Sequence, residues 1–233
     1  MQKVRWLGLL CLLAVGCAAS PMEREAPQID PDRPHLEFKL VYNFDVYQKP
    51  SIFLPKSYPT YVIWLEEKTS GNIYTIFITG KAGKNTWILA ESRPESVPVW
   101  YGVKQESKSD LNLDAVSGAT PAGEAAVILW QVPQNLINKN VDVYIEANNS
   151  YDYNDYYTKE KGTPGYSAAN GQPSLIWKAR LDLSEKMSEA ISPEIIGHGH
   201  VQGLNHQIDP DVSKITTANE TFQYIGIRYS AHP

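Results

Sequence analysis

The sequence predicts an all-β fold: an antiparallel β-sandwich with long loops, in a domain that follows a signal peptide and a short tether. Short runs rich in β-branched and aromatic residues recur along the chain, and clusters of Pro, Gly and Asn separate them. Helical periodicity is scarce and does not alternate with these runs, which favours an antiparallel sandwich over a parallel α/β sheet. With 233 residues, of which 42% are hydrophobic, the chain is long enough for one domain with its own core.

The chain begins with a processing signal over residues 1–16. Two basic residues precede an apolar run that is too short to span a bilayer. The run ends at Leu13-Ala14-Val15-Gly16-Cys17, which resembles a bacterial lipobox, the sequence at which a peptidase cuts before a lipid-carrying cysteine. The resemblance implies a lipoprotein anchored through Cys17 in the bacterial cell envelope and facing the periplasm. Ala18 follows the cysteine where Asp would favour the inner membrane, so we expect the outer membrane; a plainly secreted protein is the alternative.

Residues 17–34 predict a flexible tether, because four prolines lie among mixed charges without any apolar period. The folded domain is then expected over residues 35–233. The formal net charge is −5, and loss of the basic residues of the signal leaves the rest more acidic, which argues against a nucleic-acid partner. Both cysteines fall within the first 17 residues, so neither a disulfide framework nor a cysteine-ligated metal site is expected in the domain.

The first strand is expected over residues 36–44, where Leu36, Phe38 and Leu40 alternate with polar residues. Two β-rich runs, 61–67 and 73–79, flank a Gly-containing link and predict a hairpin. A short helix is expected around residues 93–101. Residues 148–174 are polar and rich in tyrosine, and an insertion of this length is usually functional or disordered. Further strands are expected at 85–90, 125–131, 141–147, 174–181 and 224–229.

The hairpin around Trp64-Leu65-Glu66, the motif from Leu113 to Pro121 and the run from Val141 to Ala147 make the domain similar to a known family. That family consists of predicted periplasmic proteins of unknown function. Its members are labelled by similarity to the immunoglobulin-like domain of the flagellar hook-capping protein. The resemblance implies an immunoglobulin-like sandwich, in agreement with the strand pattern, but a fold alone assigns no chemistry.

The most specific motif is Asp114-Ala115-Val116-Ser117-Gly118-Ala119-Thr120. It resembles the acceptor sequence at which bacterial flavin transferases attach FMN, through a phosphoester, to a threonine of extracytoplasmic electron carriers. The resemblance implies Thr120 as the acceptor, Ser117 and Gly118 as part of the acceptor segment, and Asp114 at its acidic position. It also implies a flavin transferase and envelope redox proteins as partners. The same residues equally suit a tight turn between strands, so both interpretations stay open.

Three histidines form the second candidate site. His198, His200 and His206 lie close together in the sequence, and the first two would share one side of an extended segment. Imidazole suits zinc or copper, so the cluster is a candidate site for either metal. The surrounding glycines also favour a solvated surface loop, which is the alternative.

Two functional hypotheses from different classes follow. The domain carries no Gly-x-Ser-x-Gly elbow, Gly-rich phosphate loop or nucleophilic cysteine, which argues against an enzyme and allows at most a redox carrier. The first hypothesis is a lipid-anchored envelope protein with covalent FMN at Thr120. The alternative is a non-catalytic envelope module, binding or structural, that binds a protein, a sugar or a metal ion through residues 148–174 and the histidine segment.

Overall fold

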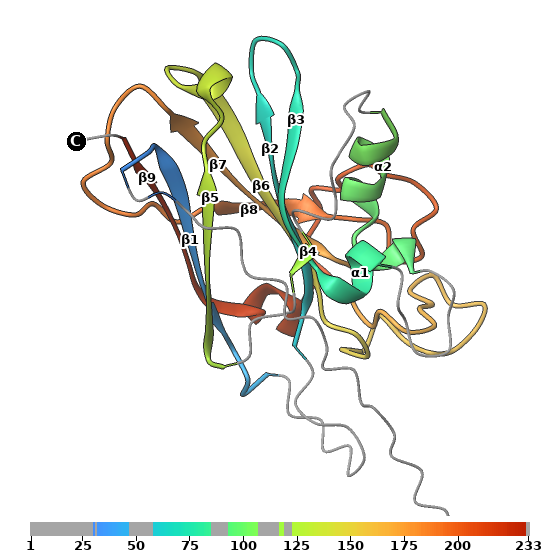
Figure 1. Cartoon of the computed structure of the whole chain (residues 1–233). Coiled ribbons are helices and arrows are strands. Elements are labelled where there is room, and N and C mark those ends of the chain that lie inside the picture. The colour runs from blue at the N-terminus through green and yellow to red at the C-terminus, as the bar shows by residue number, and fades with distance from the viewer. Residues whose placement is uncertain are drawn as a thin grey trace, which may run out of the picture.

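The computed structural model describes residues 30, 32–46, 58–84, 93–106, 117–118 and 123–231. These residues form two β-sheets packed face to face, and a layer of helices and loops covers the outer side of the larger sheet (Figure 1). The all-β sandwich expected from the sequence is therefore confirmed. The predicted signal peptide, Cys17 and most of the predicted tether lie outside the described residues.

The smaller sheet has three antiparallel strands in the order β5-β1-β9. Side chains at every second position of β1, which include Leu36, Phe38 and Leu40, are fully buried against the other sheet, as the period of a strand requires. The strands are β1 (His35–Tyr42), β5 (Ala125–Gln131) and β9 (Phe222–Ser230).

The larger sheet has the order β4-β3-β2-β6-β7-β8, and its pairs are antiparallel except for the parallel pair of β3 and β4. The predicted hairpin is present as β2 and β3. The short strand β8 was not predicted from the sequence and lies at the opposite edge from β4. The strands are β2 (Thr60–Glu67), β3 (Ile73–Thr79), β4 (Ser117–Gly118), β6 (Asn140–Asn148), β7 (Leu175–Asp182) and β8 (Glu194–His198).

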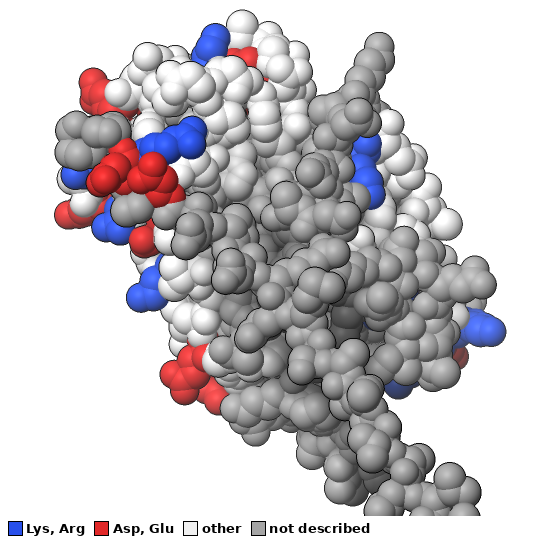
Figure 2. Space-filling model, viewed as in Figure 1, with Lys and Arg blue, Asp and Glu red and all other residues white. Residues whose placement is uncertain are grey.

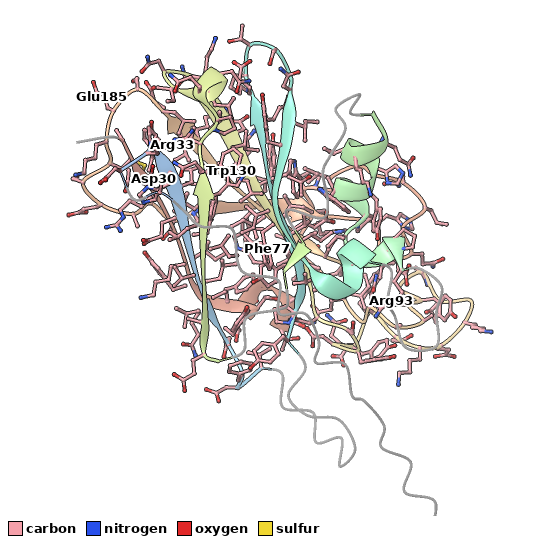
Figure 3. The ribbon with its side chains drawn as sticks, in the orientation of Figure 1. Asp30, Arg33, Phe77, Arg93, Trp130 and Glu185 are labelled. Atoms are coloured by element: carbon pink, nitrogen blue, oxygen red, sulfur yellow. The ribbon has the colours of Figure 1, made fainter. Side chains whose placement is uncertain are left out.

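The main core lies between the two sheets and is rich in aromatic rings. Phe77 points into this space (Figure 3) and stacks on Tyr61 with ring centroids 5.3 Å apart. Trp177 of β7 meets Phe222 of β9 edge to face at 5.6 Å, so the contact joins the two sheets. Burying one such side chain stabilises the fold by roughly 1.5–3 kcal/mol, and this core therefore dominates the stability of the sandwich.

A second, smaller core lies on the outer side of the larger sheet. Val62 and Ile176 of the sheet pack there with Val99 and Trp100 of helix α2. The helix predicted around residues 93–101 in fact begins later, because Pro98 suits a first helical position and the residues before it form a separate 3₁₀ turn. The predicted strand at 85–90 lies outside the described residues. The helical segments are α1 (Gly80–Lys84), η1 (Pro94–Ser96), α2 (Pro98–Glu106), η2 (Gln134–Leu136) and η3 (Thr217–Glu220).

The other end of the outer side carries a group of charged residues around Asp142. Its buried carboxylate accepts from Lys68 and Lys178 at 2.8 Å each and pairs with Arg180 at 3.5 Å. Burial raises the pKa of Asp142, but the two lysines outweigh it and hold the pKa below its usual range. Lys178 also lies over the ring of Tyr144. On the face shown in Figure 2, basic and acidic side chains of the described residues are likewise interspersed.

Candidate functional site

Two long segments, residues 149–174 and 199–216, lie beside α2 on the outer side of the larger sheet (Figure 1); we call them the loop layer. Arg93 lies beside this layer (Figure 3), and its buried guanidinium donates to Ser150 Oγ at 3.0 Å and to Asn170 Oδ1. The Asn170 side chain in turn donates to the carbonyl oxygens of Glu95 and Val201. One buried arginine–asparagine pair thus joins both segments of the layer to the turn before α2.

A second group of polar side chains joins the loop layer to η3. The Gln172 amide donates to Asp152 Oδ2 at 2.9 Å and to Thr217 Oγ1 at 2.7 Å, and its oxygen accepts from the Thr216 backbone N–H at 2.7 Å. Thr217 Oγ1 donates to Asp152 Oδ1 at 2.6 Å. Because these groups satisfy one another in a buried setting, the tyrosine-rich insertion is an ordered part of the fold.

A fully buried carboxylate, Glu146 on β6, holds α2 against the sheet. It accepts from the backbone N–H groups of Val99 and Trp100 at 3.2 and 2.8 Å, and from Ser174 Oγ at 2.7 Å. These N–H groups belong to the first turn of α2, where backbone N–H groups have no acceptor within the helix. Glu146 therefore acts as a helix cap that is supplied by a distant strand. Burial raises the pKa of Glu146 to about 7, although the three donors favour its ionised form.

Glycines let the loop layer approach the sheet and itself closely. A Cβ on Gly199 would lie 2.7 Å from Ser174 Oγ and 3.2 Å from Glu146 Oε1. Gly171 has φ +73°, and a Cβ there would lie 2.4 Å from three backbone atoms of Asp152. Both contacts require the absence of a side chain.

The outward surface of the loop layer exposes several large apolar side chains. They come from both segments and are Tyr151, Tyr156, Leu204 and Val212. Lysines lie close to some of these rings: Lys159 is 5.8 Å from the ring centre of Tyr151, and Lys214 is 5.7 Å from that of Tyr156. An open groove of about 490 Å³ runs along the surface where residues 154–156 meet residues 213–216. This surface combines flat apolar faces with polar groups on a hydrogen-bonded support.

The structure describes only part of the predicted flavin-acceptor motif. Ser117 and Gly118 form β4, which pairs in parallel with Ile78 and Thr79 at one edge of the larger sheet. Asp114 and Thr120 lie outside the described residues.

The three predicted metal ligands each bond to backbone groups. Both ring nitrogens of His198 face carbonyl oxygens, Gly199 O at 2.8 Å and Asp211 O at 3.2 Å. The Nδ1 atom of His200 accepts from the Gln202 backbone N–H, whereas that of His206 donates to Pro98 O at 2.7 Å. Within the described ranges, no group of three or more His, Cys, Asp or Glu side chains is placed to hold a metal ion. The rings of His198 and His206 join the loop layer to β8 and α2.

Sequence reasoning missed Glu146 and Asn170, which organise the loop layer. Glu146 lies at an alternate position of a β-run, where a charged residue normally predicts a solvent-facing side chain. Its partners come from α2 and Ser174, which the sequence does not place near it. Asn170 lies in a polar segment that resembles any surface loop.

The fold and the site together define a β-sandwich whose larger sheet carries an ordered layer of loops. Comparison of the chain with protein-family models, curated proteins and solved structures found no match. None of the helices in the described ranges is long and apolar enough to cross a membrane.

Proposed function

We propose that this chain is a non-catalytic, lipid-anchored module of the bacterial cell envelope that binds its ligand through the loop layer. The observation that carries the proposal is that buried Arg93, Asn170 and Gln172 hold a surface that exposes tyrosine and leucine side chains. Such a surface loses little conformational entropy on binding. Exposed aromatic rings on a rigid support are the groups that dominate binding energy at interfaces.

The buried titratable groups favour binding over catalysis. Glu146 has a raised pKa, as catalytic acids often do. However, its side chain is fully buried and its oxygens accept from helix and serine donors, so it has no access to a substrate. A structural cap accounts for all of these features.

Anchoring through Cys17 suits a binding module. A tether over residues 17–34 would reach on the order of 60 Å when fully extended. The domain could then present the loop layer to a ligand at some distance from the lipid surface.

The test is co-sedimentation with a bacterial cell-envelope preparation, using the mature chain with Cys17→Ser so that no lipid mediates binding. We expect saturable binding that Tyr156→Ala/Leu204→Ser weakens about tenfold or more. Tyr224→Ala/Leu129→Ser is the matched control, because it removes exposed side chains of the same types from the smaller sheet. Equal effects of the two double variants, or no binding of the parent chain, would contradict the proposal.

A second candidate function is that of a covalent FMN carrier modified at Thr120. The observation that favours it is the position of β4, since the centre of the acceptor-like motif forms the last strand at a sheet edge. A transferase needs its acceptor segment to be accessible. The flavin would supply the redox chemistry, and the protein would supply its position.

Intact-mass analysis of protein coexpressed with a flavin transferase tests this candidate. We expect a yellow protein with the mass of one FMN added, and loss of both in Thr120→Ala. Thr69→Ala, on the exposed turn between β2 and β3, serves as the control because it removes a threonine hydroxyl outside the motif. An unmodified parent chain would rule the carrier function out.

A further inference from the structure

The groove of the loop layer has a lining of mixed chemistry. It lies between the turn at residues 154–156 and the segment 213–216 and has a volume of about 490 Å³. This size is within the range of small-molecule sites, which is about 300–1,000 Å³. The lining consists of Asn154, Asp155, Tyr156, Ser213, Lys214 and Thr216.

Asn154 fixes the two walls of the groove relative to each other. Its Oδ1 accepts from the backbone N–H groups of Tyr156 and Tyr157 at 3.0 and 2.7 Å. Its Nδ2 donates to Lys214 O at 2.9 Å and to Thr216 Oγ1 at 3.1 Å. The side chain thereby uses both of its donor hydrogens and both lone pairs of its oxygen. The groove is preformed and does not depend on a ligand for its shape.

A buried neighbour supports the ring of Tyr156. The buried ring of Tyr157 meets it edge to face, with centroids 5.0 Å apart and an interplanar angle of 85°. Ile215, which lies between the groove residues Lys214 and Thr216 in the sequence, is buried in the main core. Tyr156 itself remains 40% exposed, so this support presents an aromatic ring at the groove.

We propose that this groove binds a pyranose sugar of an envelope glycan. The inference rests on the proposed binding function and names its ligand class. A pyranose ring has an apolar C–H face that packs on an aromatic ring, and its hydroxyls both donate and accept. The Asp155 carboxylate accepts and the Lys214 ammonium donates. The Thr216 hydroxyl already accepts from Asn154 and donates to Gln172. The groove thus offers a flat apolar face beside a carboxylate that accepts from sugar hydroxyls and an ammonium that donates to them.

The lining favours a sugar over other small ligands. An anionic ligand such as a nucleotide would meet Asp155 beside Lys214, so the groove offers no net positive charge. A wholly apolar ligand would desolvate the carboxylate and the ammonium without pairing them. A neutral polyol satisfies both charged groups.

Binding would move one group in the groove. The Lys214 ammonium lies 5.7 Å from the ring centre of Tyr156, near the outer limit of a cation–π contact of about 6 Å. A sugar stacked on that ring would displace the ammonium, which its flexible stem allows, and a sugar hydroxyl would accept from it. Lys214→Met should therefore weaken sugar binding less than Tyr156→Ala does.

Isothermal titration calorimetry and ¹H–¹⁵N NMR with cellotetraose and chitotetraose test the proposal, again with the Cys17→Ser chain. The two probes distinguish a plain β-linked glucose polymer from an N-acetylated one. We expect saturable binding of at least one probe, an affinity loss of about tenfold or more in Tyr156→Ala, and near-parental affinity in Tyr156→Phe. Tyr224→Ala is the matched control, because Tyr224 is also 40% exposed but lies on β9.

The outcomes separate this inference from the function on which it rests. If neither tetrasaccharide binds while the envelope preparation still does, the sugar assignment is wrong and the binding function stands. If a tetrasaccharide binds equally well to Tyr156→Ala, the groove is not the site. If neither the probes nor the envelope preparation bind, both proposals fail.

Discussion

Replacing Glu146 by Ala should lower the free energy of unfolding by about 3–5 kcal/mol. The substitution leaves two backbone N–H groups and the Ser174 hydroxyl without an acceptor in a buried site, and each such group costs about 1–3 kcal/mol. It also opens a cavity between the sheet and α2. Urea denaturation followed by circular dichroism measures this loss. Glu160→Gln, on an exposed part of the insertion, is the control and should change stability by less than about 0.5 kcal/mol.

The raised pKa of Glu146 should also make the stability of the fold depend on pH. Its pKa is raised to about 7 in the folded protein, whereas the ordinary value of a glutamate is 4.5. Between these two values the folded state holds a proton that the unfolded state has released, so stability falls as the pH rises from about 4.5 to about 7. The full effect of such a shift is about 3 kcal/mol.

Glu146→Gln removes this titration and keeps one carbonyl oxygen as an acceptor. The free energy of unfolding of the parent chain, relative to that of this variant, should therefore fall as the pH rises from 5 to 8. A constant difference across that range would show that burial does not raise the pKa of Glu146.

Gly171→Ala should disrupt the packing of the loop layer against itself. The new Cβ would lie 2.4 Å from backbone atoms of Asp152, and the residue would keep a positive φ of 73° that disfavours a side chain. Backbone atoms cannot rotate away, so the contact between Asp152 and Gly171 must open, and with it the hydrogen bond from Gln172 N to Asp152 O. We expect a loss of about 3 kcal/mol in stability, in line with other strained or overpacked substitutions.

Gly162→Ala separates the two causes of this effect. Gly162 lies in the same insertion with φ +90°, but no described atom lies within 4 Å of where its Cβ would be. It should cost only the backbone strain, about 1–2 kcal/mol. Equal losses in the two variants would contradict the close approach at Gly171.

The sandwich was predictable because its strands carry their signal locally. The alternation of Leu36, Phe38 and Leu40 already fixes which face of β1 is buried. Strand β8 lacks such a signal: it has five residues, includes Gly197, and owes its pairing to β7. The histidine segment was expected as a loop or a metal site, and β8 ends at its first histidine.

The candidate site was less predictable because its contacts join distant parts of the chain. Asn154 bonds to Lys214 and Thr216, some 60 residues away. Arg93 bonds to Asn170 across a similar separation. The length and composition of residues 148–174 predicted an insertion that is functional or disordered, but only the fold shows which side chains support the surface and which face outward.

Amide hydrogen exchange of the Cys17→Ser chain, with and without the cell-envelope preparation, tests the central claim most directly. If the loop layer is the binding surface, protection on binding should be concentrated in residues 149–174 and 199–216. The outer face of the smaller sheet, formed by β5, β1 and β9, should exchange at the same rate in both states. Protection confined to that sheet, or no change in the loop layer, would contradict the proposed binding surface.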